Sequence, residues 1–212
     1  MQKENLSALK KITLSGFKSI AANDLSQTIV FDDVNLIIGP NGSGKSNFIS
    51  FFKMLNHMMT GALQTYIGKN GTSENLLFFG SKKTPILSAS LEVKNDNNTD
   101  IYDFSLVKAI QDTLIFSAEK ITWNGKNIPL SSGQRESFLL SDELAPAPRI
   151  VKSLLMKCRV FQFHEVRQSG MMGCDKKCRF QCIPAQQINC SCVSVDDRQR
   201  FCLSFTAPVL LL

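Results

Sequence analysis

The sequence predicts an α/β fold in which a buried strand, a glycine-rich loop and a helix follow one another directly. A strand is expected at residues 34–38, because residues 36–38 are a continuous apolar run of the kind found in strands covered on both faces. Residues 39–46 match the spacing G-x-x-x-x-G-K-[ST] of a phosphate-binding loop. Beyond Ser46, large apolar residues recur at three- and four-residue steps until Gly61, which predicts a helix ending near residue 60. A chance glycine turn would lack these two flanks.

The residue types in this loop suit a polyphosphate. Glycines let the backbone curl around an anion, and successive N–H groups then point inward at it. The following helix directs the positive end of its dipole at the same anion. Lys45 is placed to reach the β- and γ-phosphates, and the Ser46 hydroxyl to hold Mg²⁺. With ATP and Mg²⁺ as the expected cofactors, the predicted binding residues are Gly39, Pro40, Asn41, Gly42, Ser43, Gly44, Lys45, Ser46 and Asn47.

The rest of the chain supplies strands on both sides of this unit. Two short strands are expected at residues 9–14 and 28–31. From Ile86 the pattern changes to period two, which predicts an antiparallel meander of about four strands with one face on the core and the other in water. The alternation is expected to continue through Leu114, Phe116 and Ala118. The dipeptide at residues 124–125 is Asn-Gly, a strong signal for a two-residue hairpin.

The remaining segments are less regular. Residues 65–71 show no clear period, whereas Ser73 is placed to cap a short helix that ends near Phe79. After a loop, a further helix is expected at residues 150–158, followed by a strand at residues 160–163.

Charge and hydropathy restrict the class of protein. The net charge of +6 and the isoelectric point near 9.0 suit a partner with phosphates, although a solvated basic surface explains them equally well. The apolar runs are far too short to span a bilayer, and the polar first residues do not resemble a signal peptide. We therefore expect a cytoplasmic protein that does not bind membranes.

Three segments together resemble a known family. The turn Gly16-Phe17-Lys18-Ser19, the loop at residues 39–47 and the meander resemble the RecF/SMC-like branch of ABC-type ATPases. The segment at residues 158–164 is similar to one in predicted ATPases of that branch. The resemblance covers residues 9–165. It implies a P-loop NTPase core of the ABC/RecF-like head type with an antiparallel β meander. It also implies Mg-ATP binding, a homodimer of ATP-sandwiched heads, and work on DNA in repair, chromosome maintenance or defence.

Two hallmarks of ATP hydrolysis in that family are not evident. Leu130–Gln134 resembles a signature loop, and Phe138–Glu143 resembles the end of a Walker B strand. The three residues at 135–137 make less than one helical turn, which is too short to separate the two elements, and Ser141 interrupts the apolar run. We interpret this stretch as a polar loop between the meander and the next helix. Residues 193–197 are a weaker Walker B candidate, so the catalytic residues stay unknown.

The last segment, residues 166–212, differs in composition from residues 1–165, which we interpret as the N-terminal part of an ATPase domain. It holds six of the seven cysteines, at positions 174, 178, 182, 190, 192 and 202. Cys174, Cys178 and Cys182 are spaced by four, but zinc sites usually show two separated pairs. A disulfide framework is less expected without a secretory signal. The composition is typical of a shifted reading frame, of an unrelated fused end, or of disorder.

On this interpretation the ATPase fold is incomplete at its C-terminus. The alternative function is then a truncated nucleotide-binding module without turnover. A GTPase is not favoured, because no Asn-Lys-x-Asp guanine-reading motif is present.

Two smaller sites remain as hypotheses. His164 and Glu165 follow a strand end, where catalytic groups often lie, but a lone histidine is more often structural. Phe17 and Lys18 are candidates for a position near the adenine or ribose, as in similar proteins.

Overall fold

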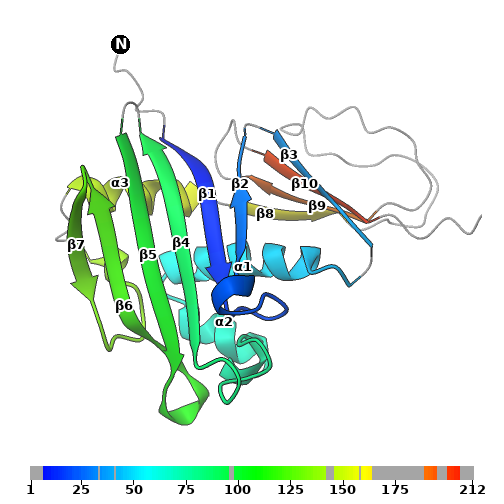
Figure 1. Cartoon of the computed structure of the whole chain (residues 1–212), viewed down its shortest axis with the longest axis horizontal. Coiled ribbons are helices and arrows are strands. Elements are labelled where there is room, and N and C mark those ends of the chain that lie inside the picture. Colours follow the sequence, from blue (N-terminus) through cyan, green and yellow to red (C-terminus); the bar gives the residue numbers. More distant parts are fainter. Residues whose placement is uncertain are drawn as a thin grey trace, which may run out of the picture.

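The computed structural model describes residues 7–32, 34–40, 42–95, 98–141, 146–157, 159–163, 189–194 and 200–205. These residues form ten strands in two sheets and three α-helices, so the fold is of the α/β type (Figure 1). None of the helices described is long and apolar enough to cross a membrane.

The first sheet has six antiparallel strands in the order β2-β1-β4-β5-β6-β7. Its strands are β1 (Ser7–Ser15), β2 (Gln27–Val30), β4 (Ile86–Asn95), β5 (Asn98–Lys108), β6 (Leu114–Trp123) and β7 (Lys126–Ser131). The predicted four-stranded meander is confirmed as β4 to β7. The early strand β1 pairs with β4, so both predicted N-terminal strands extend the same sheet.

The hairpin between β6 and β7 is confirmed by its backbone. Asn124 and Gly125 have φ values of 50° and 73°. Positive φ at both central residues is the requirement of a type I′ turn, whose twist matches that of the flanking strands. Asparagine tolerates this region better than most residues, and glycine adopts it without cost.

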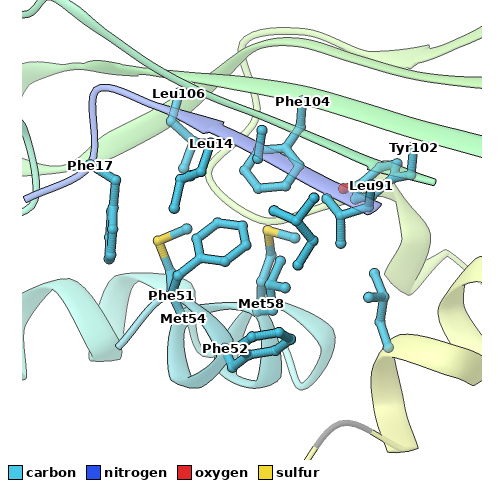
Figure 2. Packing of buried hydrophobic residues seen from close by; sticks show 14 of the residues in the cluster. Leu14, Phe17, Phe51, Phe52, Met54, Met58, Leu91, Tyr102, Phe104 and Leu106 are labelled. Carbon is cyan, nitrogen blue, oxygen red and sulfur yellow. The ribbon is translucent and has the colours of Figure 1, made fainter. Parts of the chain in front are cut away.

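The helices α1 (Lys45–Met59), α2 (Leu63–Lys69) and α3 (Pro146–Lys157) lie on one face of this sheet (Figure 1). Figure 2 shows aromatic and methionine side chains of α1 filling the space beneath the strands. Phe51 is fully buried, and its ring centre lies 5.7 Å from that of Phe17. Burying each large apolar side chain contributes roughly 2 kcal/mol, so this layer supplies most of the driving force for folding.

The opposite face of the sheet is polar, as predicted. Lys11 forms an ion pair with Glu92 there, and Lys120 lies 3.5 Å from the carboxylate of Asp103. Such exposed pairs contribute about 0 to 1 kcal/mol each, so this face adds solubility more than stability.

One residue of the core face, Asp100, is a buried carboxylate. Its side chain is fully buried, and neither oxygen has a hydrogen-bond partner within the part of the chain that is described. Burial raises the pKa of Asp100 above its usual value. The folded state therefore disfavours the ionised form, and this group costs stability as the pH rises through its folded-state pKa.

Replacing Asp100 with asparagine is expected to stabilise the protein by about 1 kcal/mol at pH 7.5, because the uncompensated charge is removed. The gain should disappear below the unfolded-state pKa of about 3.9, where wild-type Asp100 is protonated in both states. Urea unfolding of wild type and variant at several pH values measures this difference in the free energy of unfolding. Asp103→Asn is the matched control, since Asp103 faces Lys120, and it should not stabilise the protein. An Asp100→Asn variant less stable than wild type at pH 7.5 would contradict this prediction.

The second sheet contains the strand that leads into the glycine-rich loop. Its order is β3-β10-β9-β8, with β3 (Val34–Ile38), β8 (Arg159–Phe163), β9 (Asn189–Ser194) and β10 (Arg200–Phe205). The strands predicted at residues 34–38 and 160–163 are both confirmed. β3 runs parallel to β10, and among the described strands it is at the edge of its sheet.

The described part of the cysteine-rich segment contributes to this second sheet. Cys190 and Cys192 belong to β9, and Cys202 belongs to β10. The three cysteines of the zinc hypothesis, at positions 174, 178 and 182, lie outside the described residues. The division of the chain at residue 166 stays a prediction.

The local structure differs from the sequence analysis in three places. Residues 63–69 form a helix, α2, that was not predicted: Leu63, Tyr66 and Ile67 are buried at helical spacing, but residues 65–71 alone show no clear period. Ser73 does not cap a helix that reaches Phe79, because it lies within a single 3₁₀ turn and its hydroxyl donates to the carboxylate of Asp112 at 2.6 Å. The helix α3 begins at Pro146 rather than near residue 150, since proline is well tolerated in a first helical turn, where its missing N–H has no intrahelical acceptor.

A fourth correction concerns the alternation in β6. Phe116 is buried but Ala118 is exposed, and the buried face continues at Glu119 and Ile121. The pairing with β5 shifts between Ser105 and Leu106, which is a bulge that inserts one extra residue. Such an insertion reverses which side chains face the core, and a strict period of two does not anticipate it.

Candidate phosphate-binding site

The loop between β3 and α1 has the backbone form that the glycine spacing predicts. Gly42 and Gly44 have φ values of 85° and 91°, in the left-handed region that favours glycine. Gly44 immediately precedes the first residue of α1, and its carbonyl accepts from the Phe48 N–H at 3.0 Å. Asn41 lies outside the described residues. The loop therefore reverses the chain directly onto the start of a 15-residue helix.

The first glycine of the motif, Gly39, lies too close to another loop residue to carry a side chain without a shift. A Cβ atom added at Gly39 would lie 2.9 Å from the Ser43 hydroxyl oxygen, which is closer than real Cβ contacts. The Ser43 N–H donates to the Pro40 carbonyl at 3.2 Å and closes the turn. A side chain at position 39 would thus occupy the inside of the loop.

Lys45 lies across this loop. Its side chain is 5% exposed, and its ammonium group donates to the carbonyl oxygens of Gly39 and Pro40 at 2.5 and 2.7 Å. A third contact, of 3.2 Å, joins it to the Ser43 hydroxyl. The positive charge is thus held within the concave side of the loop, where an anion bound by the backbone N–H groups would meet it.

Ser46 and Asn47 complete the first turn of α1. The Ser46 side chain is exposed at the helix start, so its hydroxyl is accessible to a metal ion held beside a phosphate. The Asn47 amide donates to the Ser19 hydroxyl at 2.8 Å. The described residues of the predicted site therefore lie together in one loop. Its glycine-rich backbone, the Lys45 ammonium group and the Ser46 hydroxyl have the chemistry to bind a polyphosphate with Mg²⁺.

Phe17 does not lie at this site. It is fully buried in the core against Phe51, so its ring has no exposed face for an adenine or ribose, whereas the expectation for Lys18 stays a prediction. An apolar ring beside a buried strand gains more from the core than from a solvent-exposed face. The ammonium group of Lys18 points to Ser50 of α1 and to Asn70, at 2.6 and 3.3 Å. Burial, followed by the nearby charge of Lys53, lowers the pKa of Lys18.

The described part of the Walker B candidate, residues 138–141, is not a strand. Phe138–Leu140 is one turn of 3₁₀ helix, and Leu139 is fully buried in the core. Asp142 and Glu143 lie outside the described residues. The signature candidate begins at the end of β7 and continues into a turn, where the Gly133 N–H donates to the Phe116 carbonyl at 2.6 Å. The described part of this stretch follows the meander, as interpreted, but it is not simply a polar loop, because it forms a 3₁₀ turn that buries Leu139.

Sequence reasoning missed the group that holds this connection. The carboxylate of Glu119 is 2% exposed and accepts from the hydroxyls of Tyr102 and Ser137 at 2.7 and 2.5 Å. Its other oxygen accepts from the Ser131 hydroxyl at 3.0 Å and the Phe138 N–H at 2.9 Å. Burial, and then the charge of Glu119, raise the pKa of Tyr102 well above its usual value. The bulge in β6 turns the side chain of Glu119 toward the core. No pattern in the sequence predicts this bulge.

The two remaining hypotheses fall largely outside the structure. His164 and Glu165 lie outside the described residues. In the weaker Walker B candidate, Val193 and Ser194 end β9, and residues 195–197 are not described. Among the described residues, no group of three or more histidine, cysteine or acidic side chains is arranged to hold a metal ion.

One family model and several curated proteins match this chain. The family described as "AAA domain" matches residues 11–145. The chromosome partition protein Smc of Mycobacterium tuberculosis is 32% identical over 138 residues, which are 63% of this chain and 11% of that protein. The Smc protein of Halothermothrix orenii is 33% identical over 122 residues, which are 56% of this chain and 10% of that protein.

A solved structure is also similar. The SMC head domain from Thermotoga maritima is 25% identical, with a TM-score of 0.36, and the match covers 57% of this chain and 38% of that one. The chain spans about a tenth of the length of the curated relatives it matches.

Proposed function

Because the chain belongs to the AAA domain family, we propose that it is an Mg-ATP-binding ATPase module of the RecF/SMC-like branch. The single observation that carries the proposal is the loop between β3 and α1. There, two left-handed glycines curl the backbone, and a buried ammonium group lies within 3.2 Å of three loop oxygens at the start of a long helix.

Each residue of the loop has a role in this proposal. The backbone N–H groups of residues 41–46 hold the α- and β-phosphates, aided by the dipole of α1, whereas Pro40 has no N–H to donate. Lys45 leaves the loop carbonyls and pairs with the β- and γ-phosphates. The Ser46 hydroxyl is the protein ligand of Mg²⁺, which neutralises charge on the phosphates when it is bound.

We further propose DNA-related work and a homodimer of ATP-sandwiched heads. The support is that the similar full-length proteins are named chromosome partition proteins. The net charge of +6 is compatible with a polyanionic partner. Residues 1–165 would be the N-terminal part of the ATPase domain, and residues 166–212 a divergent segment.

Hydrolysis is a separate question, because the described residues include neither a signature loop nor an acidic Walker B end. The alternative is a nucleotide-binding module without turnover. Titration calorimetry of the full chain with Mg-ATP should show saturable binding under either function, and a phosphate-release assay at saturating Mg-ATP separates the two, because only the ATPase releases phosphate steadily. Absence of binding would overturn the proposal, whereas steady phosphate release that Lys45→Ala abolishes would favour the ATPase over the binding module.

A further inference from the structure

The turn at Gly16–Ile20, which the nucleotide-binding proposal leaves without a role, contacts the beginning of α1. The turn is closed by the Ile20 N–H, which donates to the Phe17 carbonyl at 2.8 Å. Lys18 within it has a φ of 50°, in the left-handed region. Non-glycine residues held in this region carry strain and cluster at functional sites.

Lys18 anchors the second turn of α1. Its ammonium group donates to the Ser50 hydroxyl at 2.6 Å, and Ser50 lies one helical turn beyond Ser46. Ser50 is also within 2.6 Å of the Tyr66 hydroxyl, which donates to the Ser50 carbonyl at 2.7 Å. A second bond, of 3.3 Å, joins Lys18 to the side-chain oxygen of Asn70 after α2. These part-buried bonds tie the turn, α1 and α2 together.

Ser19 contacts the first turn of the same helix. Its hydroxyl accepts from the Asn47 amide at 2.8 Å. It also lies close to the loop, since a Cβ added at Gly44 would be 3.1 Å from it. Two adjacent side chains of one turn thus contact the first two turns of α1, of which the first carries Lys45 and Ser46.

These contacts matter because of how the two sheets are connected. The turn follows β1 of the six-stranded sheet, whereas the loop follows β3 of the other sheet. Apolar packing holds α1 beneath the first sheet, but the hydrophobic effect itself is non-directional. Hydrogen bonds near the start of α1 are directional and fix where the loop presents Lys45. A shift of about 1 Å at a phosphate site is costly.

We propose that Lys18 and Ser19 are positioning residues for the phosphate site, acting through Ser50 and Asn47 on the first two turns of α1. This inference rests on the proposed function, because it concerns the same site. Neither residue needs to touch the nucleotide.

The test measures the dissociation constant for Mg-ATP by titration calorimetry on the full chain. Lys18→Met and Ser50→Ala are each expected to weaken binding about fivefold, since each removes the same hydrogen bond. Ser19→Ala is expected to weaken it about threefold, because its bond to Asn47 is exposed. The double variant Lys18→Met/Ser50→Ala should bind no more weakly than about the worse single variant, since the two residues act as one unit.

Ser50→Ala separates positioning from a simple effect of charge, because it keeps the ammonium group of Lys18. If Lys18→Met weakens binding and Ser50→Ala does not, Lys18 acts through its charge and the inference is wrong. Ser19→Thr keeps the hydroxyl and should bind within about twofold of wild type. The melting temperature without nucleotide is measured for every variant, and losses of affinity that track losses of stability would also overturn the inference.

Two control variants lie on the outer face of the sheet. Lys120→Met removes a lysine that pairs with Asp103, and Ser117→Ala removes a hydroxyl that donates to the Ser105 carbonyl at 3.2 Å. Both should bind Mg-ATP like wild type. Failure of the wild-type chain to bind Mg-ATP would overturn the proposed function and this inference together. Wild-type binding with unchanged Lys18→Met and Ser19→Ala variants would overturn this inference alone.

Discussion

Replacing Lys45 with alanine is expected to weaken Mg-ATP binding by the full chain at least a hundredfold. The lysine is the only side-chain cation that the described loop directs into its concave side, where the Nζ atom lies 2.5 Å from the Gly39 carbonyl oxygen. A hydrogen bond to a charged group contributes about 1.5 to 3 kcal/mol to binding. Lys45 is proposed to contact two phosphates, so its contribution is about twice that. Two such bonds correspond to a factor of a hundred or more in the dissociation constant.

Titration calorimetry with Mg-ATP measures this effect, with Lys120→Ala as the matched control. Lys120 is also a lysine with an oxygen partner, Asp103, but it lies on the polar face of the sheet and away from the loop. The control should bind like wild type. A Lys45→Ala variant that still binds Mg-ATP with near wild-type affinity would show that the nucleotide is not held by this loop.

The parts of the fold that were predictable are those set by local chemistry. The strand at residues 34–38, the helix starting at Lys45 and the hairpin at Asn124 each depend on residue types that are adjacent in the chain. Glycine and asparagine favour turns because they adopt positive φ at little cost, and apolar residues at helical spacing favour a helix because they lie on one buried face. The resemblance to the RecF/SMC-like branch rests on the same local motifs, and the family match confirms it.

What was missed depends on contacts between distant residues. The sequence does not show that Ser73 pairs with Asp112, which is 39 residues away, nor that the carboxylate of Glu136 accepts from the Leu63 N–H at the start of α2. Likewise, a turn such as residues 16–20 gives no local sign that Lys18 reaches Ser50. The bulge in β6 is the clearest case, because one inserted residue turned Glu119 inward and Ala118 outward.

Replacing Glu119 with alanine is expected to destabilise the protein by about 3 to 5 kcal/mol. Four donors converge on its carboxylate, and two of them, the hydroxyls of Tyr102 and Ser137, belong to buried side chains. Leaving buried donors without a partner costs roughly 1 to 3 kcal/mol each, and the missing side chain adds a cavity. The connection from β7 to α3 loses its main polar attachment at the same time.

Urea unfolding measures this loss, and two further variants test its cause. Glu92→Ala removes a carboxylate that pairs with Lys11 on the polar face, so it should cost less than about 1 kcal/mol. Tyr102→Phe removes one of the four donors, and its cost should largely vanish in the Glu119→Ala background, because the tyrosine hydroxyl has already lost its main acceptor. If Glu119→Ala costs no more than Glu92→Ala, the carboxylate is not what attaches this connection to the sheet. If the two losses instead add in full, Tyr102 and Glu119 contribute independently, and the connection must be held by the buried Leu139 and its apolar neighbours.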